Sequence, residues 1–236
     1  MANQSIPPTI DWVSGHIELL DQTLLPTQVH TLAITSTSQL VDAISRLAVR
    51  GAPALGVAGA LGVALALQEG GERGWNEAEI SEAIEQVRNA RPTAVNLAWG
   101  VEQVRPLISA GFDQVLAAAL EIAKADEAAN RAMGRRGADW WLANIGDRPL
   151  RLLTHCNTGA LATTAWGTAL GVIRELAVRN RIEIVFADET RPLLQGARLT
   201  AWELHQEGIP YRVLPDGAAA MAIMNGEVDG ALIGAD

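Results

Sequence analysis

The sequence predicts an α/β protein: a mainly helical N-terminal domain with a short β start, followed by a Rossmann-like, doubly wound parallel sheet. Two observations predict this architecture. Up to about residue 145, apolar residues recur mainly at helical spacing. After the turn cluster Gly146–Pro149, short and continuously apolar segments alternate with helical ones, which is the pattern of a parallel sheet covered on both faces. We therefore expect an N-terminal domain at 1–146 and an α/β domain at 147–236.

The N-terminal elements follow from the periodicity of the apolar residues. Alternating apolar and polar positions in the first forty residues indicate a small antiparallel β piece, with a break at Leu25-Pro26. From Ser38 onward the spacing becomes helical. The predicted helices span Ser38 to about Arg50, Ala54–Leu67 with a stop at Gly70-Gly71, Asn76–Asn89, Leu97–Ile108 and about Asp113–Ala143.

The second half predicts alternating strands and helices, with right-handed crossovers. The expected strands are Leu150–Thr154, Ile182–Ala187, Tyr211–Leu214 and Gly230–Gly234, and the expected helices are about Thr163–Arg179, Leu193–Glu207 and Ala218–Asn225. The sequence stops on a strand end, so we expect the natural protein to continue and this sheet to be truncated at its C-terminus.

Composition restricts the classes of partner. The chain has 236 residues, is 49% apolar and carries a formal net charge of −9, which disfavours nucleic acid and anionic membranes as partners. Its one cysteine, Cys156, excludes internal disulfides and fits a reducing compartment. The beginning of the sequence shows no secretory pattern, and Ala52–Leu67 is shorter than the roughly 20 apolar residues of a membrane span. We therefore expect a cytoplasmic protein with Ala52–Leu67 as a buried helix.

Polar groups follow every predicted parallel strand. They are His155-Cys156-Asn157, Asp188-Glu189, Asp216 and Asp236. Ligands of open α/β sheets bind outside the carboxyl ends of the strands, so these groups are expected to line one crevice.

Cys156 has two readings that the sequence leaves balanced. The turn Asn157–Ala160 is predicted to open a helix, whose free N–H groups would face the crevice and favour a thiolate or a bound anion. A free cysteine can equally pack as a small buried hydrophobe. His155 beside it is expected to be structural.

Asp236 and two arginine turns complete the candidates. Asp236 follows an apolar strand and Gly234-Ala235, so its carboxyl is expected to have a raised pKa suited to a general acid, although an exposed acid is the simpler reading. Asp188 and Asp216 are expected to cap helices or bond loops. Arg50 and Arg91 lie at Pro-containing turns that could present a guanidinium to phosphate, or could be ordinary surface residues. No Cys/His/Asp cluster has metal-ligand spacing.

Taken together, several segments resemble methylthioribose-1-phosphate isomerases. The segments are Arg50–Gly56, Arg91–Leu97, Thr154–Gly159, Glu189–Gly196, Arg198–Leu204 and Gly234–Asp236. The resemblance implies an aldose–ketose isomerase of methionine salvage that converts 5-methylthioribose 1-phosphate to the ketose without a metal or organic cofactor. It also implies a homodimer, Cys156 and Asp236 as the catalytic pair, and substrate binding by Arg50, Gly51, Ala52, Arg91 and Gln195.

The resemblance leaves other activities open. The same fold is expected in ribose-1,5-bisphosphate isomerases, in isomerases of 5-deoxyribose 1-phosphate, and in regulatory subunits of a translation-initiation nucleotide exchange factor, which are binding modules. Our hypothesis for catalysis is that Asp236 protonates the ring oxygen and that Cys156 assists transfer of hydrogen from C2 to C1. Whether a proton or a hydride moves stays open.

Overall fold

A computed structural model describes residues 6–234 of the chain. It contains two compact units. We call 8–24 with 28–126 the helical unit, and 1–7, 25–27 and 127–236 the sheet unit. The border between them lies within a long helix, α5 (Phe112–Ile145), whereas the sequence placed it at the turn that follows this helix.

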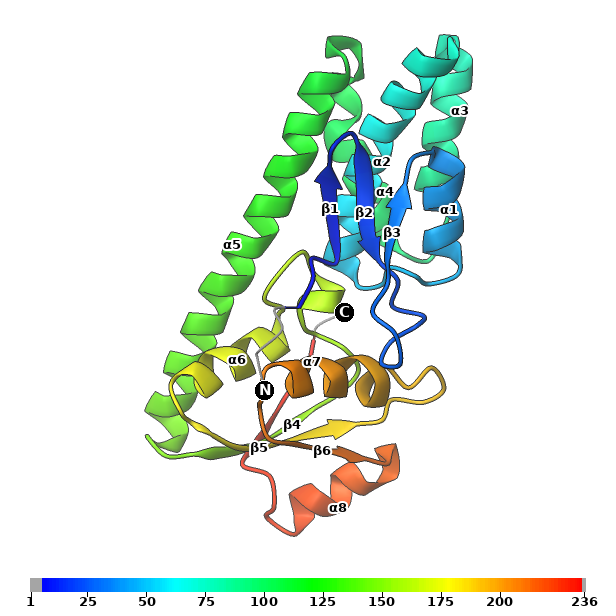
Figure 1. The fold of residues 1–236 in the computed structure, drawn as a ribbon. Coiled ribbons are helices and arrows are strands. Elements are labelled where there is room, and N and C mark those ends of the chain that lie inside the picture. Colours follow the sequence, from blue (N-terminus) through cyan, green and yellow to red (C-terminus); the bar gives the residue numbers. More distant parts are fainter. Residues whose placement is uncertain (1–5, 235–236) are drawn as a thin grey trace. The chain divides into compact units, whose positions relative to one another are not determined.

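The helical unit begins with the antiparallel β piece that the sequence predicted. Strands β1 (Ile10–Val13), β2 (His16–Leu20) and β3 (Thr31–Ile34) pair in the order β1-β2-β3 (Figure 1). The alternation places Ile17 and Leu19 in the core, where both are fully buried.

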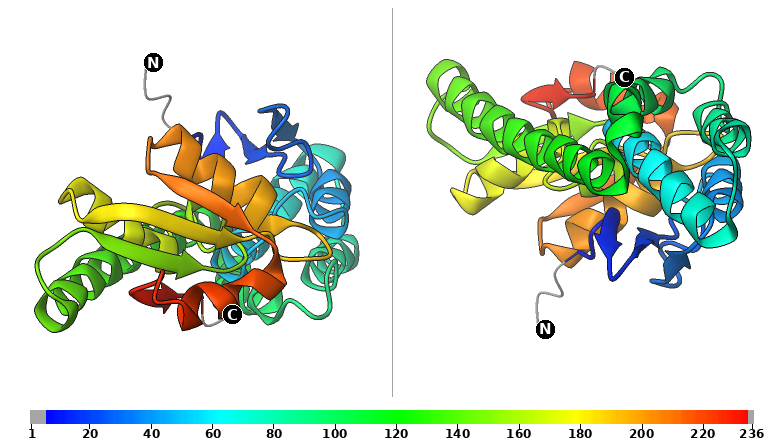
Figure 2. Two further views of the ribbon diagram at one scale, coloured as in Figure 1. Left: turned by 90° about the horizontal axis from the view of Figure 1, so that it is seen from below. Right: turned by 90° about the horizontal axis from the view of Figure 1, so that it is seen from above.

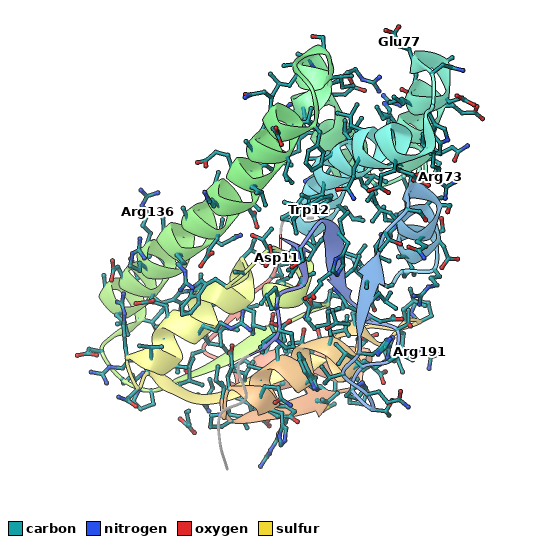
Figure 3. The ribbon with its side chains drawn as sticks, turned by 45° about the horizontal axis from the view of Figure 1, so that its top comes forward. Asp11, Trp12, Arg73, Glu77, Arg136 and Arg191 are labelled. Carbon is teal, nitrogen blue, oxygen red and sulfur yellow. The ribbon has the colours of Figure 1, made fainter. Side chains whose placement is uncertain are left out.

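Helices form the rest of this unit, as predicted. They are α1 (Thr37–Ser45), α2 (Ala52–Arg73), α3 (Glu77–Arg88), α4 (Val95–Val104), the 3₁₀ helix η1 (Arg105–Ala110) and the first part of α5. Asn76 caps α3 by accepting hydrogen bonds from the N–H groups of Ala78 and Glu79, which explains the predicted start at that residue. Trp12 on β1, labelled in Figure 3, contacts Phe112 at the start of α5 with ring centroids 5.9 Å apart.

Helix α2 is the buried core helix that its composition predicted. It is long and apolar enough to cross a membrane, but 78% of its most apolar window is buried inside the protein. Its glycines permit backbone contact with α4: a Cβ placed on Gly100 would lie 1.8 Å from the carbonyl oxygen of Gly56. The Ala- and Gly-rich sequence of α2 therefore gives close helix packing.

The predicted stop of α2 at Gly70-Gly71 is wrong. The helix continues to Arg73 and ends at Gly74, which has the left-handed conformation of a C-terminal cap (φ 70°). Gly70 is a packing residue, because a Cβ placed there would lie 2.7 Å from the side chain of Ile80. Gly70 therefore serves the contact between α2 and α3 instead of breaking the helix.

The sheet unit confirms the doubly wound architecture. Its strands β4 (Leu150–Thr154), β5 (Ile182–Asp188), β6 (Tyr211–Leu214) and β7 (Gly230–Leu232) are all parallel, in the order β6-β5-β4-β7. Helices α6 (Ala169–Val178) and α7 (Ala201–Gln206) cover one face, and α8 (Ala219–Met224) covers the other (Figures 1 and 2).

The core of the sheet unit lies between the sheet and its helices. Leu152 and Val185 on the central strands pack with Leu170 of α6 and Leu204 of α7. The second half of α5 joins this core through Trp141, against which Gly230 of β7 packs so closely that no side chain would fit.

Two helix starts differ from the prediction. The helix expected from about Thr163 begins at Ala169, and residues 155–168 form a loop that contains the short 3₁₀ helix η2 (Ala160–Ala162). The helix expected from Leu193 begins as the π-helical turn η3 (Gly196–Thr200), which continues into α7. The reason for the first difference lies in the site described next.

Candidate active site

The strand order defines a crevice at one position of the sheet. From β4 the chain crosses through α6 to β5 on one side, whereas β7 pairs with the other side of β4 and is reached through α8 on the opposite face. Such a topological switch point opens a crevice outside the carboxyl ends of the two strands, here β4 and β7. Cys156 follows the end of β4 directly. Asp236 follows the end of β7 in the sequence and lies outside the described residues.

The backbone of Cys156 is held from both sides by threonines. Its N–H donates to Thr190 Oγ1 (2.8 Å), and its carbonyl oxygen accepts from Thr200 Oγ1 (2.6 Å). The residue has φ 61°, a left-handed conformation that is uncommon without glycine and marks a fixed turn. Cys156 is half-buried, so it is not a hydrophobe sealed in the core.

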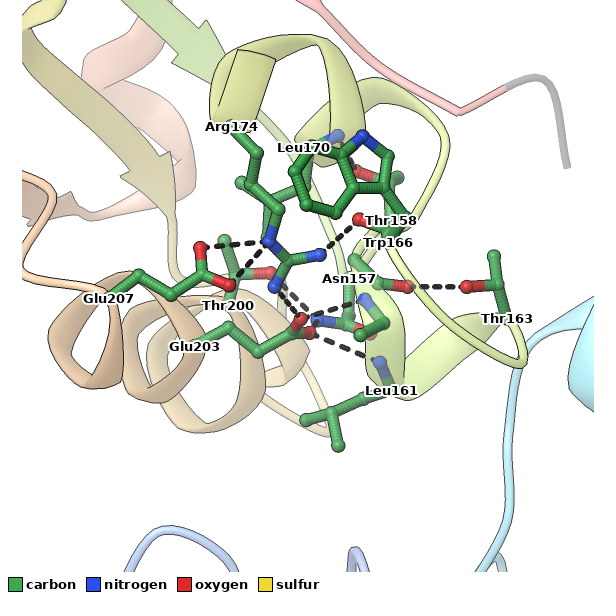
Figure 4. A network of polar contacts seen from close by, with 12 residues as sticks. Asn157, Thr158, Leu161, Thr163, Trp166, Leu170, Arg174, Thr200, Glu203 and Glu207 are labelled. Atoms are coloured by element: carbon green, nitrogen blue, oxygen red, sulfur yellow. Dashed lines mark hydrogen bonds and ion pairs between the residues drawn. The ribbon is translucent and has the colours of Figure 1, made fainter. Parts of the chain in front are cut away.

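The N–H groups of Ala160 and Leu161 are not directed at the crevice, so the prediction is wrong for these two. Glu203 on α7 collects them: the N–H of Ala160 donates to Glu203 Oε2 (2.7 Å), and the N–H of Leu161 donates to Glu203 Oε1 (3.4 Å). Asn157 Nδ2 donates to Glu203 Oε1 as well (2.7 Å; Figure 4). A Cβ on Gly159 would collide with this carboxylate, so glycine is required there. The loop therefore folds around a buried carboxylate, which delays the start of α6.

Glu203 belongs to a buried ionic cluster with Arg174 and Glu207. Glu203 is 0% exposed and Arg174 is 3% exposed. Arg174 donates from Nη2 to Glu203 (2.5 Å) and from Nε to Glu207 (2.6 Å), and from Nη1 to the carbonyl of Trp166. Burial raises the pKa of Glu207, although the guanidinium of Arg174 opposes this. This cluster was not predicted from the sequence, although charged residues stand out within the apolar segments Gly171–Leu176 (Arg174 and Glu175) and Ala201–Leu204 (Glu203).

A second polar cluster joins the ends of β4, β5 and β6. His155 Nδ1 lies 3.0 Å from Asp188 Oδ2, and Asp216 accepts hydrogen bonds from the N–H groups of Thr190 (2.8 Å) and Arg191 (2.9 Å). The expected loop-bonding role of Asp216 is thus confirmed. Burial raises the pKa of Asp188, whereas the amide of Arg191 lowers the pKa of Asp216. Arg191 itself is labelled in Figure 3.

This second cluster is also a potential set of metal ligands. His155, Asp188 and Asp216 each offer one ligand atom, and these atoms lie within 4.8 Å of one another. The sequence did not indicate this set, because the residues follow three different strands and have no ligand spacing. The hydrogen bonds above already engage all three side chains.

Gln195 lies in the loop that follows β5, in the same unit as Cys156. It is half-buried and immediately precedes Gly196, where a Cβ would collide with the carbonyl oxygen of Asp188. The loop thus folds back tightly over the end of β5, and both Cys156 and Gln195 lie at the carboxyl edge of the sheet.

The remaining predicted binding residues lie in the helical unit. Gly51 is the N-cap of α2 with φ 90°, a conformation that favours glycine, and Ala52 begins the helix. Arg50 precedes this N-terminus, and Arg91 lies in the turn before α4, where its carbonyl accepts from Ala94 N (2.9 Å). Both arginines are half-buried. Arg50, Gly51 and Ala52 thus form one helix N-terminus suited to an anion.

Comparison with known proteins adds independent information. The chain is 45% identical to a 5-deoxyribose 1-phosphate isomerase of Moorella thermoacetica over 96% of its length and 66% of that protein. Further curated relatives, 42% to 46% identical, are named methylthioribose-1-phosphate isomerase. The chain spans between 42% and 66% of the length of the first curated relatives that it matches.

Two solved structures share the fold. The 5-methylthioribose 1-phosphate isomerase of Pyrococcus horikoshii is 32% identical, with a TM-score of 0.86 over 99% of this chain and 67% of that one. The translation initiation factor eIF-2B subunit delta of A. fulgidus is 38% identical, with a TM-score of 0.85 over 98% of this chain and 68% of that one. A family model, the initiation factor 2 subunit family, matches residues 48–236. The chain therefore belongs to the initiation factor 2 subunit family.

Proposed function

We propose that this chain carries the catalytic site of an aldose–ketose isomerase that acts on 5-methylthioribose 1-phosphate. The observation that carries the proposal is the position of Cys156 at the topological switch point between β4 and β7, in a fixed backbone conformation. A packing cysteine needs neither the crevice nor the two threonine hydrogen bonds that hold its peptide groups. The names of the relatives supply the substrate class.

The proposed roles follow from the chemistry of a sugar 1-phosphate. Its anomeric carbon is blocked by phosphate, so the ring opens only with acid assistance. In the proposal Asp236 protonates the ring oxygen, and Cys156 assists transfer of hydrogen from C2 to C1. Gln195 contacts the substrate. Arg50, Gly51, Ala52 and Arg91 bind the substrate and its phosphate, as a helix N-terminus and a planar guanidinium suit an anion.

The first test is Cys156→Ser in the natural protein that contains this chain. A positioned acid–base group contributes roughly 10²–10⁴-fold to a rate, and we expect kcat to fall by that order. Serine keeps the size of the side chain, so the circular dichroism spectrum and thermal midpoint should not change. Unchanged turnover by a folded variant would remove Cys156 from the mechanism.

A second experiment separates the two routes of hydrogen transfer. Turnover in deuterium oxide should place solvent deuterium at C1 of the ketose if a proton moves through an enediol-type intermediate. A hydride shift leaves C1 free of solvent label. Mass spectrometry of the product distinguishes the routes.

A specific alternative substrate is 5-deoxyribose 1-phosphate, because the relative from Moorella thermoacetica is named as an isomerase of this sugar phosphate. One small substituent that binds in an apolar pocket changes the ratio of kcat/KM between two substrates by only about 10–200-fold. The ratio of kcat/KM for the two aldose phosphates decides the preference. Ribose 1,5-bisphosphate serves as the third substrate in this assay.

The non-catalytic alternative is a regulatory subunit of an initiation-factor complex, as in the structure from A. fulgidus. Capture of initiation-factor subunits, with no turnover of any of the three sugar phosphates, would favour it. We also propose a cytoplasmic homodimer, which sedimentation and cell fractionation test.

A further inference from the structure

We propose that the sheet unit has a second binding site, at the amino edge of its strands, for a small organic cation with an apolar body. The site is a cavity between the ends of α6 and α7. It lies at the edge of the sheet opposite Cys156, and its existence does not depend on the isomerase proposal.

The cavity has the size and lining of a ligand pocket. Its volume is about 470 Å³, within the range of small-molecule sites. Ala177, Ile182, Ile209 and Pro210 form an apolar wall, and the charged lining groups are Glu207 and Arg174.

The charge balance around Glu207 favours a cation. Glu203 and Glu207 share one guanidinium, that of Arg174, so the ionised cluster carries one excess negative charge. Arg174 is already engaged by both carboxylates and by the carbonyl of Trp166. The side chain of Glu207 is 28% exposed and lines the cavity.

Two helix ends add to this negative potential. Helix α6 ends at Val178 and α7 ends at Gln206, and residues just beyond both ends line the cavity. Helix C-termini carry partial negative charge from their last carbonyl groups, which favours cations.

Arg174 is the cation that lines the cavity, and its donors are engaged by Glu203, Glu207 and the carbonyl of Trp166. Two further arginines beyond the lining are paired with other carboxylates. Arg179 pairs with Asp139 (2.6 Å) and with Glu175 (2.9 Å), and Arg181 pairs with Asp147. Neither arginine therefore neutralises the cavity. The chemistry that fits is an ammonium head group against Glu207 and a short alkyl chain against the apolar wall.

The experiment uses three probes that differ in charge and little in shape. We would titrate n-butylammonium chloride, n-butanol and sodium butyrate into the isotopically labelled chain, and follow the backbone amide signals of Asn180 and Gly208 by NMR. We expect saturable shifts with n-butylammonium. Butanol should bind at least about tenfold more weakly than n-butylammonium, and butyrate should have the weakest effect. Equal affinity for the charged and neutral probes, or no shifts at these amides, would overturn the proposal.

Two variants separate charge from shape. Glu207→Gln keeps the volume of the side chain and should bring n-butylammonium to the affinity of butanol. Ala177→Leu fills the cavity and should weaken the binding of both n-butylammonium and butanol, while the charge of Glu207 is unchanged. If Glu207→Gln does not fold, the three-probe comparison in the unmodified chain still decides the question. Unchanged n-butylammonium affinity in a folded Glu207→Gln chain would refute the role of the carboxylate.

Discussion

Substitution of Arg174 tests how much the buried ionic cluster of Arg174, Glu203 and Glu207 contributes to stability. In Arg174→Met the apolar length of the side chain is kept, but Glu203 and Glu207 are left as two carboxylates without their shared cation. Breaking a buried ion pair by removing one partner costs about 3–5 kcal/mol of unfolding free energy. Since a domain of this kind is stable by about 5–15 kcal/mol in total, the variant should be severely destabilised.

A matched control lies a short distance along the same segment. Arg179 also pairs with two carboxylates, Asp139 and Glu175, but its side chain is 29% exposed against 4% for Arg174. Solvated ion pairs contribute about 0–1 kcal/mol, so Arg179→Met should be nearly neutral. The difference between the two variants isolates the effect of burial from the effect of losing an arginine.

The pH dependence gives an independent check on the cause. Without Arg174 the pKa of Glu207, which burial already raises, should rise further, because the guanidinium that opposes this rise is gone. A raised folded-state pKa of an acid means that stability is lost as the pH rises through it. The deficit of Arg174→Met should therefore be larger at about pH 8 than at about pH 5.

Urea unfolding, monitored by circular dichroism, measures these free energies. Hydrogen exchange adds a local readout. The N–H groups of Ala160 and Leu161 donate hydrogen bonds to Glu203, and they should lose protection from exchange in Arg174→Met. The reasoning fails if Arg174→Met and Arg179→Met are equally stable at about pH 8, or if the deficit of Arg174→Met does not shrink on acidification.

Two further predictions concern packing and charge elsewhere in the chain. Gly100→Ala should lower stability by about 1–3 kcal/mol in urea unfolding, because the new methyl group would lie 1.8 Å from the carbonyl of Gly56. Gly71→Ala, where nothing lies within 4 Å, should instead stabilise by about 0.5–1 kcal/mol; the same sign for both would contradict the packing argument. Asp229→Asn should cost about 1.5–3 kcal/mol at neutral pH, because Arg148 holds the pKa of the Asp229 carboxyl far below its ordinary value and the N–H of Arg151 also donates to it (2.7 Å). A lowered pKa stabilises the fold above the ordinary value of 3.8, so the difference from the unmodified chain should shrink below that pH, and a constant difference would refute the assignment.

The architecture was predictable because each local pattern agrees with the global fold. The mainly apolar strand Leu150–Thr154, buried except at Arg151, fits a sheet covered on both faces, and the alternation within His16–Leu20 fits a half-buried strand. The polar groups at strand ends follow from the same pattern, since the carboxyl edge of a parallel sheet collects them.

The interior of the site was not predictable from local sequence. The sequence of the turn Asn157–Ala160 resembles the start of a helix. Nothing nearby in the sequence indicates that Glu203 will accept a hydrogen bond from the N–H of Ala160. The stop predicted at Gly70-Gly71 failed for a similar reason, because Ile80 on the next helix determines that contact.

By itself, the sequence determined the types and order of the elements, the strand-end position of Cys156 and the burial of α2, because these depend on periodicity and on residue types that act within a few positions. Only the tertiary structure decided which groups meet: Arg174 with Glu203 and Glu207, His155 with Asp188, and the cavity beside Glu207. Those contacts join residues from separate elements, and their energies depend on burial, which no local segment of the chain specifies.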